Sequence, residues 1–207
     1  MSLKSTVFRP TLWLSRSELS GSGLHIHFSL NDSRGENVFA SPVNALSSMM
    51  RLCIAGQLAL MPASVAILAP GVNAFRRLRK NLTEPVFNSW GYNTRSAALR
   101  IPCSDESNRR IEYRLAGADA NPYLVTATIL TGMLYGLEHI DEGDLPEPQH
   151  DHPELPLFQQ EAIEAFARCQ YLTDSLGDAF SEQWVACKLS ELDWFERIVT
   201  QEESHLA

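Results

Sequence analysis

The sequence has few of the features that would place it outside the ordinary globular proteins. It contains four cysteines in 207 residues, and none of them forms a CxxC pair, so neither a disulfide framework nor a zinc site is expected. Basic residues are also scarce, with 17 Lys and Arg against 25 Asp and Glu and a net charge of -8. Because nucleic acids and anionic membranes are bound through surplus positive charge, neither is expected as a partner.

Long apolar runs are lacking as well. The uncharged stretch 52–75 is interrupted by Gln57, Pro62 and Pro70, which predicts a pair of buried helices, to about residue 60 and then to 69, rather than a membrane span. The chain does not open with a basic and apolar leader. The scattered cysteines indicate reduced, mostly buried thiols, so a cytoplasmic location is expected.

The remaining pattern is a strand-rich first half followed by a helix-rich second half. Alternating or β-prone segments predict strands over 23–30, 97–101 and 110–115. Apolar periodicity and capping residues predict a helix from 41 to about 60, a second short helix that ends at 69, and helices over 121–140, 157–176 and 179–200, with an exposed acidic loop over 141–156. The fold class is therefore α+β, with a partial antiparallel sheet and a helical C-terminal half.

Two of the strands carry side chains that could act together. His25 and His27 lie two residues apart and so project from the same face of a strand, where imidazoles can bind a metal or a phosphate. Glu112 lies between Arg110 and Arg114 at the same spacing, so a carboxylate for a hard cation adjoins arginines for an anion. Exposed histidines and a cross-strand charge cluster explain the same residues without any function. If the strands are neighbours, however, the side chains converge on a surface suited to metal-assisted phosphoryl transfer.

Further arginines gather around these strands although the chain is acidic. They are Arg76, Arg77, Arg95, Arg100 and Arg109. The planar guanidinium binds carboxylates and phosphates through two hydrogen bonds, but solvated or salt-bridged arginines account for the clustering as well. Glu84, in a Thr-Glu-Pro segment, would be a mobile acid over that surface or simply a solvated loop residue.

Four segments, taken in order, resemble motifs of the glutamine synthetase superfamily. They are residues 21–30 (GSGLHIHFSL), 70–78 (PGVNAFRRL), 95–102 (RSAALRIP) and 110–124 (RIEYRLAGADANPYL). The resemblance covers nearly the whole chain and implies that residues 1–207 are the C-terminal part of the family's catalytic domain. The family's N-terminal domain and its early strands, which bear further metal-binding carboxylates, are absent, so the chain alone is expected to be inactive.

The resemblance implies that one group of residues binds ATP and its metal ions. The two implied ligands of Mg²⁺ (or Mn²⁺) are His25 and Glu112. The residues implied to contact the nucleotide or its phosphates are His27, Ser29, Arg95 and Arg100.

A second group is implied to bind glutamate and to act in catalysis. The glutamate-binding residues are Gly21, Arg77, Glu84 and Arg114. Glu84 and Arg95 are the implied catalytic residues: Glu84 closes the site and helps to deprotonate the amine, and Arg95 binds phosphate. In the implied reaction ATP phosphorylates the side-chain carboxylate of glutamate, and an amine then displaces phosphate to leave a γ-glutamyl amide.

The acceptor is indicated by residues 114–121 (RLAGADAN), which are more similar to glutamate–polyamine ligases than to ammonia-using enzymes. A polyamine or another primary amine is therefore expected, with ammonia as the alternative. A non-catalytic sensor of nitrogen metabolites and a transferase for an unrelated acid remain open as other functions. Since the family forms large rings, the full-length protein is expected to be a large homo-oligomer, which does not carry over to the 207 residues alone.

Overall fold

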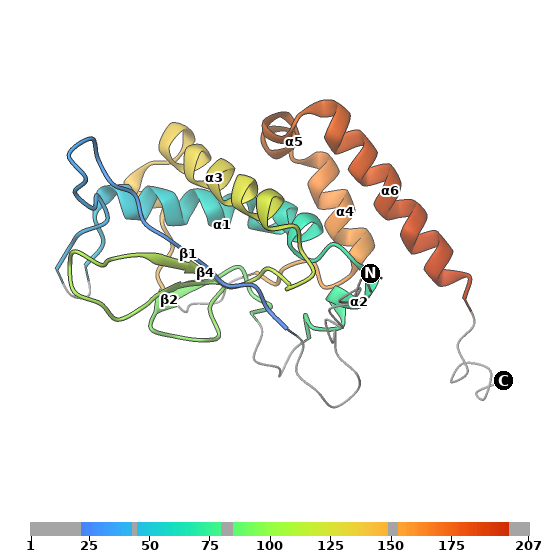
Figure 1. Cartoon of the computed structure of the whole chain (residues 1–207), viewed down its shortest axis with the longest axis horizontal. Helices are drawn as coiled ribbons and strands as arrows, with labels where there is room; N and C mark the ends of the chain where they lie inside the picture. Colours follow the sequence, from blue (N-terminus) through green and yellow to red (C-terminus); the bar gives the residue numbers. More distant parts are fainter. Residues whose placement is uncertain (1–21, 43–44, 80–84, 149–152, 199–207) are drawn as a thin grey trace, which may run out of the picture.

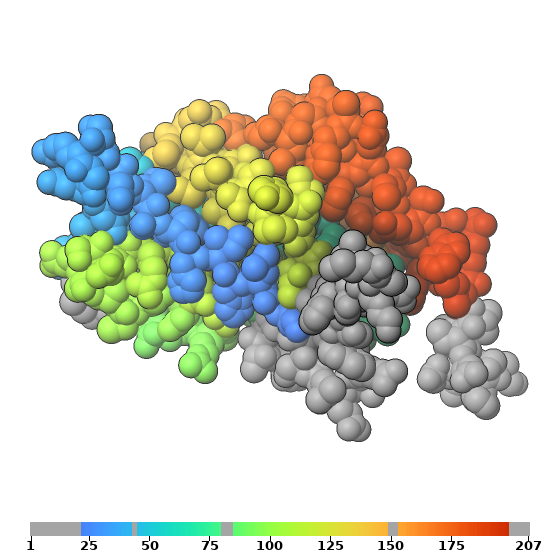
Figure 2. All heavy atoms as spheres, viewed as in Figure 1, coloured from blue at the N-terminus to red at the C-terminus, as the bar shows by residue number. Residues whose placement is uncertain are grey.

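The computed structural model describes residues 22–42, 45–79, 85–148 and 153–198. A small sheet and two long helices, α1 and α3, form one part of the molecule, and the last three helices extend from it (Figure 1). The space-filling view shows these last helices, in orange and red, as a lobe beside the sheet and the blue segment that contains β1 (Figure 2). The α+β class predicted from the sequence is confirmed.

Within the described residues, the sheet has four strands of three residues each. They are β1 (Ile26–Phe28), β2 (Trp90–Tyr92), β3 (Leu99–Ile101) and β4 (Ile111–Tyr113). Their spatial order is β1-β4-β3-β2, and only the pairing of β2 with β3 is parallel among the described strands. Each of the three predicted strands is therefore confirmed over three of its residues, whereas β2 was not predicted.

The register of β4 decides which side chains meet on the sheet. Glu112 lies opposite His27 of β1 and opposite Arg100 of β3. Because side chains alternate along a strand, all three project from one face. The neighbouring side chains of β4 point the other way, where Tyr113 is fully buried and hydrogen-bonded to Ser64 of α1. The helices thus cover one face of the sheet and leave the polar face free of them.

Helix α1 (Ser48–Leu68) runs unbroken through Pro62, so the predicted break near residue 60 is wrong. Proline has no N–H to donate to the carbonyl four residues earlier, and such a gap usually kinks or ends a helix. Here the freed Leu58 carbonyl accepts a hydrogen bond from Asn88 Nδ2 at 2.8 Å. The helix has the length and composition of a membrane span, but 78% of its most apolar stretch is buried, as in a core helix.

Helix α3 (Pro122–His139) packs closely along α1. Asn121 begins it by accepting a hydrogen bond from the Tyr123 backbone N–H at 2.9 Å, as its Asn-Pro sequence predicts. Glycines make the close approach possible, since a side chain at Gly56 would collide with the backbone of Gly132 and Gly136. The short 3₁₀ helix η1 (Glu142–Asp144) follows in the predicted acidic loop.

The C-terminal helices are α4 (Gln159–Arg168), α5 (Gln170–Leu176) and α6 (Asp178–Glu196), and the short α2 (Val72–Phe75) precedes β2. A single helix over 157–176 was predicted, and this was wrong because Cys169 leaves the helical conformation with a ψ of 85°. In α6 only Ser181 is buried among the described side chains.

The four cysteines are free, as predicted, but they are not mostly buried. Only Cys53 is buried, and burial raises the pKa of its thiol to about 12. Cys103 and Cys187 are exposed, and Cys169 is half-buried.

Candidate functional site

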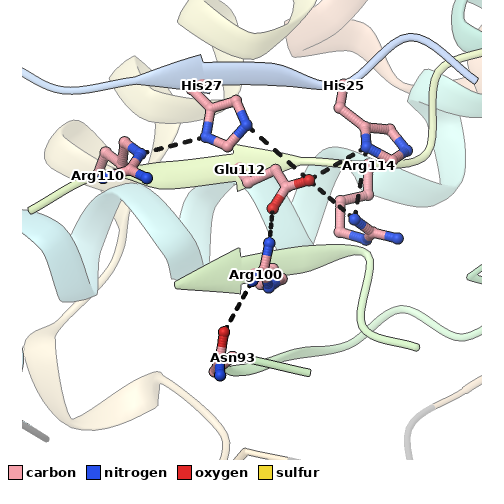
Figure 3. A network of polar contacts seen from close by, with 7 residues as sticks. All are labelled: His25, His27, Asn93, Arg100, Arg110, Glu112 and Arg114. Carbon is pink, nitrogen blue, oxygen red and sulfur yellow. Dashed lines mark hydrogen bonds and ion pairs between the residues drawn. The ribbon is translucent and has the colours of Figure 1, made fainter. Parts of the chain in front are cut away.

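The site is built around the carboxylate of Glu112, whose side chain is only 4% exposed. Arg100 Nη1 of β3 donates a hydrogen bond to Oε2 at 2.6 Å, and Arg114 Nη1 donates to Oε1 at 2.8 Å. Figure 3 shows that the carboxylate points toward both guanidiniums, one from each side. The carboxylate is thus fixed in position by a residue of β3 and by the residue that directly follows β4.

The two histidines reach the same carboxylate from β1 and from the segment just before it. His25 Nδ1 lies 3.1 Å from Glu112 Oε1, and His27 Nε2 lies 4.0 Å from the same oxygen. Arg110 Nε lies 3.4 Å from His27 Nδ1 (Figure 3). The side chains of His25 and His27 are 36% and 44% exposed, so they form the open edge of the cluster.

The charges of the cluster keep Glu112 ionised. Burial by itself would raise the pKa of Glu112, because a carboxylate loses solvation in the interior. The hydrogen bonds and positive charges of Arg100 and Arg114 outweigh this effect and hold the pKa of Glu112 below its ordinary value. The result is a buried anion within a surface that is otherwise cationic and therefore attractive to phosphate and carboxylate groups.

The spacing of two donors fits part of a metal site. Neighbouring ligands of an octahedral cation with bonds of about 2.1 Å lie about 3 Å apart, and His25 Nδ1 is 3.1 Å from Glu112 Oε1. Within the described ranges there is no group of three or more His, Cys, Asp or Glu side chains that could hold a metal ion. These residues therefore fit a divalent cation as two of its ligands, and further ligands would have to come from elsewhere.

The remaining sequence-predicted residues are less closely associated with Glu112. Arg77 is fully buried, and its Nη2 donates to the carbonyl of Leu115, the residue after Arg114, at 2.7 Å. Ser29 is exposed just after β1, and Arg95 is exposed between β2 and β3, outside the network of Figure 3. Gly21 and Glu84 lie outside the described residues.

Sequence reasoning missed Asn93, which belongs to the network. Its side-chain Oδ1 accepts a hydrogen bond from Arg100 Nη2 at 2.7 Å (Figure 3). The available signal was the position of an asparagine directly after an aromatic strand, since asparagine is favoured where a strand ends in a turn. That signal indicates a turn and not a partner for Arg100.

Comparison with known proteins gives one consistent result. Residues 13–206 match the family model "Glutamine synthetase, catalytic domain". The chain is 43% identical over 192 residues to the gamma-glutamylputrescine synthetase PuuA of Escherichia coli, and 33% identical over 198 residues to the glutamine synthetase of Pyrococcus woesei. It is also 41% identical over 124 residues, 59% of this chain, to a glutamate–isopropylamine ligase of a Pseudomonas species, of which it covers 27%.

A solved structure described as GmaS without ligand superposes on the chain with a TM-score of 0.80 at 27% identity, and the match covers 92% of this chain. The chain spans less than half of the length of each of these relatives. It covers 40% of the Escherichia coli protein, 44% of the Pyrococcus protein and 45% of the GmaS chain, while 90% of its own residues align with each of the first two.

Proposed function

The chain belongs to the glutamine synthetase family, and on that premise we propose that it is the C-terminal part of the catalytic domain of an ATP-dependent glutamate–amine ligase. The observation that carries the proposal is the position of Glu112. It is buried, ionised and held by Arg100 and Arg114 at 2.6 and 2.8 Å, with His25 at 3.1 Å. A carboxylate and an imidazole beside two anion-binding guanidiniums are the groups that phosphoryl transfer to a carboxylate requires.

Each residue of the cluster has a part in the proposed reaction. Arg100 would bind the transferred phosphate, and Arg114 would bind a carboxylate of glutamate, because each guanidinium keeps N–H groups beyond the one that contacts Glu112. His27 and Ser29, exposed along one edge, would contact the nucleotide, and Arg95 would add positive charge from the segment between β2 and β3.

Glu112 and His25 would hold Mg²⁺ or Mn²⁺, which neutralises charge on the phosphoryl group when it is bound. Glu112 also sets the orientation of both arginines. Arg77 would help to position Arg114 through its hydrogen bond to the carbonyl of the next residue, Leu115. Gly21 and Glu84 are proposed to bind glutamate, and Glu84 to help deprotonate the amine, from the sequence resemblance alone.

We propose a primary amine as the acceptor, with a polyamine as the first choice. The support comes from the relatives that this chain matches, which include a gamma-glutamylputrescine synthetase, a gamma-glutamylethanolamide synthetase and a glutamate–isopropylamine ligase. Ammonia is the alternative, because glutamine synthetases match at 32% to 36% identity. A cytoplasmic location and a large homo-oligomeric whole protein are proposed from the sequence.

The test is product formation by the longest form of the protein that contains this chain. With ATP, glutamate and Mg²⁺ or Mn²⁺, it should release phosphate and form a γ-glutamyl amide, detected by mass spectrometry, with putrescine, ethanolamine, isopropylamine or ammonia. The 207-residue chain alone should not turn over, because it supplies only two metal ligands from its described residues. Two results would refute the ligase proposal. One is that the longest form releases phosphate without glutamate, and the other is that it releases no phosphate with any of the amines.

A further inference from the structure

Asn93 has an unusual backbone conformation for a residue with a side chain. Its φ of 49° is the only positive φ of a non-glycine residue in the described part of the chain. This left-handed conformation costs about 1 kcal/mol or more for most residues, and asparagine tolerates it better than others. The Asn93 N–H donates to the carbonyl of Ile101 at 2.9 Å, which ties this turn to the end of β3.

The turn directs the Asn93 side chain at Arg100. Asn93 Oδ1 accepts from Arg100 Nη2 at 2.7 Å, while Arg100 Nη1 donates to Glu112 Oε2 at 2.6 Å. Because the guanidinium is planar, an acceptor on each terminal nitrogen fixes both its position and the direction of its plane. Figure 3 shows Arg100 between these two acceptors, with Glu112 on one side and Asn93 on the other.

We propose that Asn93 is a positioning residue, which orients the Arg100 guanidinium for the phosphate of the substrate. The inference rests on the proposed function, in which Arg100 binds that phosphate. With Glu112 as its sole partner, the guanidinium could rotate about that single hydrogen bond. The bond to Asn93 removes this freedom before the substrate arrives, and preorganised charge stabilises a transition state more effectively than charge that must be reoriented.

A different role must be separated from this one, since asparagine could be present only because it accepts a left-handed turn. Asn93→Gly separates the two roles, because glycine keeps the positive φ at no steric cost but lacks the acceptor. Asn93→Asp is the conservative variant that retains an acceptor of the same length. Asn108→Gly is a matched control, since Asn108 is also exposed in a turn and its side chain bonds only to Asp105 among the described residues.

The first measurement uses the isotopically labelled 207-residue chain and detects the side-chain N–H signals of Arg100 by NMR. A guanidinium held at both terminal nitrogens gives slowly exchanging, resolved Nη signals. Asn93→Gly should average these signals, whereas Asn93→Asp and Asn108→Gly should keep them resolved. The amide spectrum of Asn93→Gly shows whether this variant is folded, and Asn108→Gly shows the effect of a glycine in another exposed turn. Resolved Arg100 signals in folded Asn93→Gly would overturn the inference.

The second measurement uses the longest form of the protein that contains the chain. Asn93→Gly should lower kcat about tenfold, as a misoriented catalytic charge does, with the KM for glutamate changed by less than about twofold, and Asn93→Asp should recover most of kcat. An unchanged kcat in Asn93→Gly, or an equal loss in Asn108→Gly, would overturn the positioning role. If the unsubstituted protein forms no amide, the proposed function fails, and the NMR signals still decide whether Asn93 holds Arg100.

Discussion

At the scale of single residues, we expect Glu112 to be a costly side chain to alter. Its carboxylate is 4% exposed and balances two guanidiniums that are 21% and 9% exposed. Glu112→Gln keeps the shape but leaves both guanidiniums without their counter-charge, so we expect the free energy of unfolding to fall by about 2–4 kcal/mol. Urea denaturation of the 207-residue chain measures this change.

The matched control for that variant is an exposed ion pair of the same type. Arg34 and Glu36 lie 3.0 Å apart, and their side chains are 74% and 70% exposed. Solvent screening and side-chain entropy make such pairs weak, so Glu36→Gln should cost less than about 1 kcal/mol. Equal losses in the two variants would mean that the buried Glu112 cluster stabilises the fold no more than an exposed ion pair does.

Asp119 is a carboxylate whose replacement should stabilise the fold, by an amount that depends on pH. Burial raises the pKa of the Asp119 carboxyl, although its own backbone N–H and the charges of Arg77 and Lys188 act against this. A raised pKa in the folded state means that ionisation at neutral pH weakens the fold, and that the loss disappears when Asp119 is protonated in both states. Asp119→Asn should therefore raise the free energy of unfolding at pH 7, but by less than about 1 kcal/mol, because Asp119 is only half-buried and solvent screens its charge.

The gain from Asp119→Asn should shrink as the pH falls and vanish below the ordinary carboxyl pKa of 3.8. Denaturation of the unsubstituted chain and the variant in parallel from pH 7 to pH 3 checks the sign. A variant that is less stable at pH 7 would instead indicate that the attraction of Arg77 and Lys188 for the Asp119 carboxylate outweighs its burial.

The central residues of the site could be predicted because their spacing fixes the face they share. Two-residue intervals place His25 beside His27, and Glu112 between Arg110 and Arg114, on one face of each strand. The sequence does not show which strands are neighbours. That the two strands are adjacent was a hypothesis, and the pairing of β1 with β4 confirms it. Asn93 could not be predicted, since its role depends on a left-handed turn and on a neighbour seven residues away.

At the scale of elements, α1 depends on a side chain that is remote in sequence. Asn88 Nδ2 donates to the Leu58 carbonyl that Pro62 leaves without a partner. Asn88→Ala should therefore lower the free energy of unfolding by about 1–2 kcal/mol, because it leaves a carbonyl without its donor in a helix that is mostly buried. In a Pro62→Ala background the same change should cost less, since the substituted alanine has a backbone N–H that can donate to that carbonyl.

A double-mutant cycle in urea measures this coupling. Additive losses in the two single variants and the double variant would show that Asn88 does not replace the missing helical hydrogen bond.

The errors in the predicted elements have related causes. The break near Pro62 was predicted from local chemistry that Asn88 compensates through a tertiary contact. The strand β2 (Trp90–Tyr92) was missed because its three residues, with a glycine at the centre, show no alternation, and it forms by pairing with β3. Conversely, α3 was predicted well because its Asn-Pro start is a local signal that its own residues satisfy.

At the scale of the whole molecule, stability is expected to be unevenly distributed. Most of α1 is buried, and its apolar residues join the sheet to α3 and α4. By contrast, Ser181 is the only buried residue of α6 within the described ranges, and α6 extends from the body of the molecule (Figure 1). A helix that buries little side-chain surface opens locally at a lower free energy than the core does.

Hydrogen exchange measured by mass spectrometry should therefore separate the two helices in the 207-residue chain. Amides of α1 should exchange only through global unfolding, with the free energy found by denaturation, whereas amides of α6 should exchange through local opening at a lower free energy. Glu112→Gln provides an internal check, because it weakens the sheet and should lower the protection of α1 without changing that of α6. Equal protection of α1 and α6 would show that the C-terminal helices unfold together with the core, and the low burial of α6 would then not describe its stability.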